Sequence, residues 1–440
     1  MKHMIRTIFT AAFAFILFTG NAQTRPDSSL PNATLEACVQ YALTHQPVVQ
    51  QSLLDEAITE KQIQARLSDW YPQVNFSYNL QHNFELPAAY FNGGYLRTGT
   101  FNSSGLGIGV TQNIFNRDVL QASRTADDVR LQTRQNTSFN KIDIATNVSK
   151  AFFDVLLTRQ QAAVLYEAIA RLERSLKDAV NQYKAGITDK TDYKRATIAL
   201  NNAKAQYKQS NDLAVAKIVY LKQLMGMPDS SLLQLQYDTT RIERDAMTDT
   251  LKGVIYESRI EFRQLQTQQR LQEANLRYYK NAYLPTVSAF GNYNMGFLAN
   301  DFAKTYNQSF SSSNIGLQLS VPIFQGNRRV HQIRQAELQV KRVGWDMIAL
   351  KTRVNTQYAQ ALAQYKGYLA NYLALKENVL LADDVYKTLD LQYRSGIKTY
   401  LDVIIAESEL RTSQLNYYNA LFQLIQSKYD LDRALGNIQY

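Results

Sequence analysis

The chain contains an internal duplication that repeats at an offset of 210 residues. Residues 183–187 (YKAGI) correspond to residues 393–397 (YRSGI), and Asp192 corresponds to Asp402. Residues 224–226 match 434–436, and at nearly the same offset residues 71–72 match 284–285 and residues 113–115 match 322–324. Repetition over this length indicates two copies of one structural unit, joined by a linker. The expected bounds are residues 23–226 and 252–440 for the two halves and residues 227–251 for the linker.

Each half has the same predicted order of elements: a helix, two strands, a long helix and a returning helix. Amphipathic helices are expected over residues 34–70 and 252–283. They end at the junctions Pro72 and Pro285, because a proline disfavours helical backbone at the residue before it. Alternating apolar and polar residues then predict four strands. Their expected bounds are residues 73–81, 104–115, 286–297 and 313–323.

Two very long helices are predicted, since no proline interrupts residues 117–183 or 327–393. At about 1.5 Å per residue, each would form a rod of roughly 100 Å. Rods of this length bury their apolar stripe most readily in a coiled coil. Gly186 and Gly396 follow the rods and suit a left-handed cap at each turn. The returning helices are expected over residues 188–226 and 399–435.

Residues 1–22 predict a signal peptide. Lys2 and Arg6 precede an apolar run over residues 8–18, and a cleavage site is expected after Ala22. The run is shorter than the roughly 20 residues that a membrane helix needs. No later segment contains 18 consecutive apolar residues, so we expect a secreted mature chain without a spanning helix.

The composition and side-chain pattern argue against several classes of function. Lys and Arg are scattered among acidic residues, and removing the signal lowers the formal charge from +10 to +8, so we expect no nucleic-acid partner. Cys38 permits no internal disulfide and is expected to pack on a helix. The histidines form no spaced pair that would bind a metal, and no phosphate-binding loop or nucleophile elbow is present. We expect no enzyme activity and no cofactor.

The four predicted strands cannot close a membrane barrel alone, because the smallest single-chain barrels need eight. An open strand edge in lipid would leave backbone N–H and C=O groups without hydrogen-bond partners, and each such group costs several kcal/mol. Strands that enter a membrane therefore require several copies around one barrel. Alternation also fits a soluble half-buried sheet, so a soluble periplasmic coiled-coil adaptor or scaffold remains an alternative. Aromatic residues that could form interface girdles are Trp70, Tyr71, Phe115, Tyr278, Tyr279, Tyr283 and Phe324.

Several short motifs recur in an order typical of one known family. They are residues 35–39 (LEACV), Ala42-Leu43, Gln46-Pro47, the Tyr-Pro and Leu-Pro pairs before the strands, Pro322-Ile323-Phe324, and two Tyr-x-x-Gly-Ile turns followed by Asp. With this order and duplication, the chain resembles the outer-membrane efflux proteins of the TolC family. The resemblance covers nearly the whole mature chain.

The resemblance implies a mainly α fold with a membrane β-barrel portion. A homotrimer would place four strands per protomer in one twelve-stranded barrel in the outer membrane, above a periplasmic tunnel of antiparallel coiled-coil helices. Residues 227–251, with the chain ends, would girdle the tunnel. Such proteins are passive export ducts of tripartite efflux or type I secretion systems and carry small molecules or polypeptides. Their partners are a periplasmic adaptor, an inner-membrane transporter of the RND, ABC or MFS type, and outer-membrane lipid.

The resemblance also implies a gate at the periplasmic tip. Aspartates just after the tip turns line the entrance in the family, which points to Asp192 and Asp402, with Tyr393 and Lys398 as latch partners. Repeated acids around the mouth would favour cations. Ile405 stands where a further aspartate can occur, so a doubled acidic ring is not implied. The alternative interpretation is helix capping, since Thr399 and Asp402 have capping-box spacing and both acids lie in a first helical turn.

Overall fold

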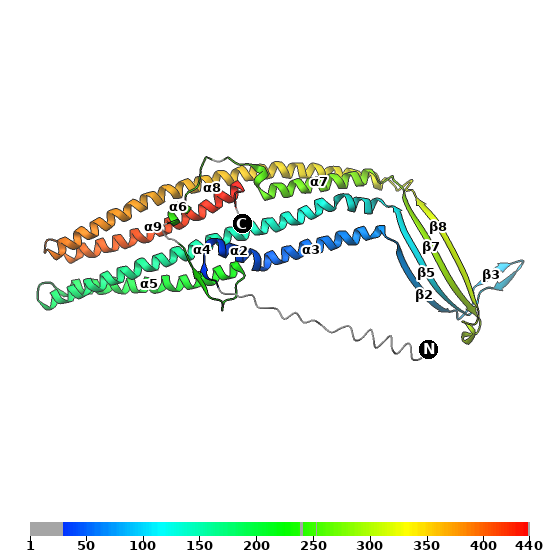
Figure 1. Cartoon of the computed structure of the whole chain (residues 1–440), viewed down its shortest axis with the longest axis horizontal. Helices are drawn as coiled ribbons and strands as arrows, with labels where there is room; N and C mark the ends of the chain where they lie inside the picture. Colours follow the sequence, from blue (N-terminus) through cyan, green and yellow to red (C-terminus); the bar gives the residue numbers. More distant parts are fainter. Residues whose placement is uncertain (1–29, 238–240, 252, 439–440) are drawn as a thin grey trace.

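A computed structural model describes residues 30–237, 241–251 and 253–438. The protomer is long and thin, with helices along most of its length and a sheet at one end (Figure 1). The expected mainly α fold with a strand portion is therefore confirmed. The predicted signal peptide, residues 1–22, lies outside the described residues.

Two long helices form the frame of the protomer. α4 spans Arg117–Lys184 and α8 spans Arg328–Arg394, so each is about 100 Å long at 1.5 Å per residue. Each turns back into a helix that lies antiparallel beside it: α5 (Lys190–Met225) packs on α4, and α9 (Tyr400–Leu435) packs on α8 (Figure 1). The second hairpin also contacts the first, because α9 packs against α4.

Shorter helices continue each hairpin toward the sheet. α3 packs on α4, and α7 packs on both α4 and α8. The helix expected over residues 34–70 is interrupted, because Gln46 has extended backbone (ψ 124°) before Pro47. The helix expected from residue 252 begins only at Ile260. The bounds are α2 Leu35–His45, α3 Pro47–Leu67, η1 Ser68–Trp70, η3 Tyr256–Ser258 and α7 Ile260–Lys280.

The four long strands form one antiparallel sheet in the order β2-β5-β7-β8. The two strand pairs therefore join through β5 and β7, one strand from each half, while β2 and β8 are the two edges of the sheet. β8 ends before Pro322, which has no N–H to donate to a ladder. The bounds are β2 Gln73–His82, β5 Asn102–Phe115, β7 Thr286–Ala299 and β8 Ser309–Ser320.

The strand register separates an apolar face from a small polar face. Phe76, Ile108 and Tyr293 form one cross-strand row, while the neighbouring polar row comprises Ser77, Gly107, Asn294 and Ser312. A Cβ at Gly107 would lie 2.7 Å from Ser77 Oγ and 2.9 Å from Asn294 Oδ1. Side chains converge on the inner face of a curved sheet, so glycine fits that face.

A small hairpin interrupts the loop expected over residues 81–104. β3 (Ala88–Phe91) pairs antiparallel with β4 (Gly94–Arg97), and Thr98 N donates to Pro87 O at 3.0 Å. This hairpin is a sheet of its own and lies beyond the end of the four-stranded sheet (Figure 1). The alternation of apolar and polar residues predicts only a loop between residues 81 and 104.

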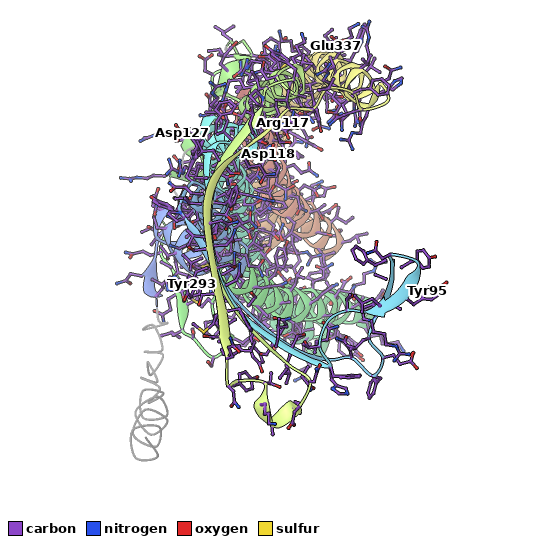
Figure 2. All side chains as sticks on the ribbon, turned by 90° about the vertical axis from the view of Figure 1, so that its right-hand side faces the viewer. Tyr95, Arg117, Asp118, Asp127, Tyr293 and Glu337 are labelled. Atoms are coloured by element: carbon purple, nitrogen blue, oxygen red, sulfur yellow. The ribbon has the colours of Figure 1, made fainter. Side chains whose placement is uncertain are left out.

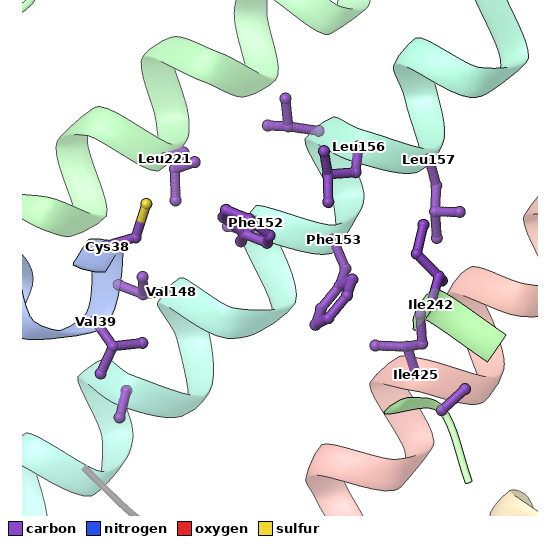
Figure 3. Packing of buried hydrophobic residues seen from close by; sticks show 14 of the residues in the cluster. Cys38, Val39, Val148, Phe152, Phe153, Leu156, Leu157, Leu221, Ile242 and Ile425 are labelled. Carbon is purple, nitrogen blue, oxygen red and sulfur yellow. The ribbon is translucent and has the colours of Figure 1, made fainter. Parts of the chain in front are cut away.

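The main core lies halfway along the helices. Phe152 and Phe153 of α4 are buried between α2 and α9 (Figure 3). Cys38 packs in this core as expected, and burial raises the pKa of its thiol to about 12, so the thiol stays protonated and unreactive. Within the described residues, no helix has the length and apolarity needed to cross a membrane.

Residues of the linker wrap this core. β6 (Leu233–Leu235) pairs in parallel with β1 (Leu30–Ala33), and the short helix α6 (Ile242–Asp245) packs on the second hairpin. The Glu243 carboxylate accepts hydrogen bonds from Lys376 Nζ of α8 (2.6 Å) and from the Tyr417 hydroxyl of α9 (2.6 Å). These two bonds anchor both helices of the second hairpin at mid-length.

Candidate functional site

The hairpin tips are two similar turns. Gly186 and Gly396 both have a φ of 74°. Ile187 N donates to Gln182 O, and Ile397 N donates to Gln392 O, which closes each turn with the bond pattern of a left-handed helix cap. A Cβ at either glycine would meet open space, so the backbone conformation rather than crowding favours glycine here.

Asp402 forms the capping box that its spacing suggests. Its carboxylate accepts hydrogen bonds from Thr399 N (3.0 Å) and Thr399 Oγ1 (2.8 Å), while Asp402 N donates to Thr399 Oγ1 (3.4 Å). The bonds from Thr399, assisted by the charge of Lys398, hold the pKa of Asp402 below its usual range. Asp402 is thus a charged group at the start of α9, with Lys398 exposed beside it.

Asp192 has a different setting from Asp402. The N-cap of α5 is Asp189, whose carboxylate accepts a hydrogen bond from Thr191 N at 2.6 Å. Asp192 lies in the first turn of α5, three residues after this N-cap. Burial raises the pKa of the Tyr393 and Tyr400 hydroxyls, and the negative charge of Asp192 adds to that rise. The duplicated aspartates therefore do not share one capping role.

Tyr393 connects the two hairpins. Its hydroxyl donates to Gln182 Oε1 of α4 at 3.0 Å, and its ring lies 5.9 Å from the buried ring of Tyr400. Ser175 Oγ of α4 donates in turn to the Tyr400 hydroxyl oxygen at 3.2 Å. The structure thus brings Tyr393 and Asp192 into one cluster and Lys398 and Asp402 into a second. Ile405, one turn beyond Asp402, is exposed.

Further along α9 lies a buried ionic triad that the sequence analysis missed. The carboxylate of Glu407 is 3.5 Å from Arg171 Nη2 of α4 and 3.4 Å from Arg411 Nη1 of α9. Glu407 is only 3% exposed, yet its Oε2 accepts no hydrogen bond from any residue that the structure describes. Burial raises the pKa of Glu407, and the two arginines oppose that shift without cancelling it. The two arginines therefore only partly offset the cost of burying the Glu407 charge where α9 packs on α4.

A cavity of about 230 Å³ lies beside this triad, between α4, α8 and α9. Its polar lining carries both signs of charge and includes Arg171, Arg174, Asp178, Asp390, Arg394 and Glu407. The sequence does carry a signal for Glu407, because it falls on the stripe of three- and four-residue steps formed by Tyr400, Val403 and Leu410. A charged residue on a buried stripe marks a special site.

The described part of the chain holds no group of three or more His, Cys, Asp or Glu side chains placed to bind a metal ion.

Comparison with known proteins identifies the family. A sequence model described as "Outer membrane efflux protein" matches residues 38–227 and 254–437. Outer membrane protein TolC of Vibrio cholerae serotype O1 is 22% identical over 373 residues, which cover 83% of this chain and 82% of TolC.

Solved structures share the fold. A membrane protein from Pseudomonas aeruginosa superposes with a TM-score of 0.74 at 18% identity and covers 94% of this chain and 93% of its own. The channel protein CusC superposes with a TM-score of 0.73 at 16% identity, covering 91% of each chain. The arrangement of long helices and strands is thus shared with these two proteins. By its matching sequence segments and its fold, this chain belongs to the outer membrane efflux protein family, the export ducts of the outer membrane.

Proposed function

We propose that three copies of this chain close one twelve-stranded barrel and act as the passive duct of a tripartite export system. The observation that carries this proposal is the sheet with two free edges, β2 and β8, and one apolar face. In lipid, every backbone group on those edges needs a partner, and β8 of one copy beside β2 of the next supplies it.

The two margins of the curved protomer also carry exposed apolar side chains. On α8 these include Leu338, Trp345, Ile348, Leu380 and Leu391, and on α3 they include Val48, Leu54 and Ile58. α8 and α3 continue from the two edge strands β8 and β2, so closing the sheet would bring these stripes together. A head-to-tail contact of this kind closes into a ring when its rotation fits.

The proposed gate is the pair of clusters at the tips. Asp192 and Asp402 would line the entrance around the threefold axis, and Tyr393 with Lys398 would hold the second hairpin in its closed position. Repetition of both aspartates in three copies concentrates negative charge, which favours cation passage.

The proposed partners are a periplasmic adaptor and an inner-membrane transporter of the RND, ABC or MFS type. The names of relatives of this chain refer both to secretion and to efflux. They include the alkaline protease secretion protein AprF of Pseudomonas aeruginosa and the probable efflux pump outer membrane protein TtgC of Pseudomonas putida. Small molecules and polypeptides are therefore both candidate cargoes, and the polar face of Asn, Ser and Gly residues would contact either one weakly.

The mass of the detergent-extracted particle tests the shared barrel. One chain of 440 residues has a mass of 50.2 kDa, so a trimer is expected at roughly 150 kDa by light scattering after correction for detergent. A monomer that stays in solution without detergent would instead support a soluble coiled-coil adaptor or scaffold.

Replacing both Asp402 and Lys398 with alanine tests the gate. If they hold the tip closed, losing this closed-state interaction should raise the open fraction in planar bilayers about fivefold. Helix capping alone predicts a lower melting temperature with unchanged conductance and ion selectivity. The matched control replaces Lys208 and Asp212, an exposed ion pair within α5 at 2.6 Å, and should leave conductance unchanged.

A further inference from the structure

The β3–β4 hairpin is an exposed aromatic arm. Asn92 and Gly93 form its two-residue turn with φ values of 47° and 85°, as a tight hairpin with a type I′ turn requires. All eight strand residues are exposed. The large exposed side chains of the arm are Tyr90, Phe91, Tyr95 (84% exposed) and Leu96, and Phe84 (89% exposed) lies just before its base.

The base of this arm is firmly held. Asn83 N donates to Phe101 O at 2.7 Å, and Asn83 Nδ2 donates to Thr100 O at 3.0 Å. Within the part of the chain that the structure describes, the tip is held by its own ladder and by the edge contact of the Tyr90 and Tyr95 rings, whose centroids lie 5.4 Å apart. A lone two-stranded hairpin is marginally stable in water, and clustered exposed aromatic side chains mark an interaction site. We therefore expect the exposed side chains of the arm to pack against another protein surface.

The position of the arm indicates what that surface is. Viewed from the sheet end, the protomer curves like a letter C, and the arm, marked by Tyr95, stands on the open side of that curve (Figure 2). In the proposed barrel, this open side faces the channel axis. Twelve strands about 4.8 Å apart and tilted by about 40° give a radius of about 12 Å. Arms of four residues reach about 14 Å, so the arm can span that radius.

We propose that the β3–β4 hairpins of three copies meet over the outer mouth of the channel and form an aromatic constriction there. This inference rests on the proposed trimeric barrel, and each arm is incomplete without the other two copies. The lack of charged side chains favours contact among the three arms. Residues 88–96 contain no Asp, Glu, Lys or Arg, so three copies can converge without charge repulsion. Glu85 and Arg97 stand at the base of the arm.

Single-channel conductance of a triple variant tests the constriction. Tyr90→Ser, Phe91→Ser and Tyr95→Ser together should raise the conductance several-fold, because they remove the rings that fill the mouth. The control is Phe302→Ser, an exposed aromatic residue in the other loop at this end of the sheet, which should leave conductance unchanged. A variant with residues 88–97 replaced by a short Gly-Ser linker should match the triple variant. Wild-type conductance in both arm variants would overturn the constriction.

Cross-linking tests the contact between copies. In a Cys38→Ser background, Tyr95→Cys should form disulfide-linked chain pairs when the detergent-extracted particle is treated with copper phenanthroline, because a disulfide needs Cα atoms within about 7 Å. Phe302→Cys is the control and should stay unlinked. Unlinked Tyr95→Cys in a particle of trimeric mass would contradict the meeting of the arms. A monomeric, non-conducting wild-type particle would instead contradict the proposed function on which the inference rests.

Discussion

Replacing Ile315 with arginine is expected to abolish assembly of the conducting particle. Ile315 is 89% exposed on the edge strand β8, and its cross-strand row continues through Gly291, Val110 and Val74 on the apolar face. An arginine on the lipid face of a barrel costs about 2–4 kcal/mol near the midplane, so three copies would cost roughly 10 kcal/mol. That sum is comparable to the whole stability of a typical domain. The measurement is the yield of trimeric mass after detergent extraction.

The matched control places the same arginine one position away. Asn314 lies on the polar face, where Asn292 Nδ2 donates to its Oδ1 at 3.1 Å. Asn314→Arg should assemble normally and shift the ion selectivity of the channel toward anions, since it adds three positive charges to the lumen. Equal loss of trimer in both variants would show that the apolar face does not meet lipid.

The second large effect is expected at the buried triad of Arg171, Glu407 and Arg411. The triple variant Arg171→Met, Glu407→Leu and Arg411→Met should stabilise the packing of α9 on α4 by about 1–4 kcal/mol, because apolar side chains of similar volume avoid the desolvation of three charges. The duct should then stay closed for longer, with a lower open fraction in bilayers and a higher melting temperature. Arg171→Met alone should act in the opposite direction, since it leaves Glu407 with one fewer partner.

The same triad predicts a pH dependence. The raised pKa of Glu407 belongs to the packed state, so protonation favours packing. The packing of α9 on α4 should be most stable below the ordinary glutamate pKa of about 4.5, and it should become less stable as the pH rises through the raised pKa of Glu407. Other titratable groups face the same cavity, namely Arg174 and Asp178 of α4 and Tyr386, Asp390, Tyr393 and Arg394 of α8.

Conductance measured from neutral to acidic pH checks this sign. The wild type should close progressively on acidification, and the triple variant should lose that dependence because it lacks Glu407. The control is Glu173→Gln, which breaks a half-exposed ion pair with Lys204 inside the first hairpin and should have an effect below about 1 kcal/mol. A wild type that opens on acidification would contradict the sign assigned to Glu407.

The sequence was most informative where local chemistry dictates the backbone. Gly186 and Gly396 mark the tip turns because a left-handed residue is needed there, and Pro322 marks the end of β8 because it has no N–H. The break at Pro47 and the β3–β4 turn at Asn92 carried equally local signals, a proline and an Asn-Gly pair. Both could have been predicted from those signals.

Other features depend on contacts between distant segments. The polar run at the start of β8, over residues 309–314, shows little alternation, and only its pairing with β7 makes it a strand. Glu407 looks like one of many acidic residues on an amphipathic helix until Arg171, 236 positions earlier, packs against it. The packing of α9 on α4 is a tertiary contact, and helical periodicity alone does not predict which helices pack together.

The anchor of α6 on the second hairpin has a mechanical consequence. Glu243 holds Lys376 of α8, and from that point α8 continues for about 27 Å to Arg394, packed beside α9. A tilt of about 10° at the anchor displaces the far end by about 5 Å, roughly one helix turn. Three such helices around one axis would change the width of an aperture by a large fraction of its diameter. A small rotation of α8 at this anchor therefore becomes a larger displacement at its end, and a partner need not touch the aperture in order to widen it.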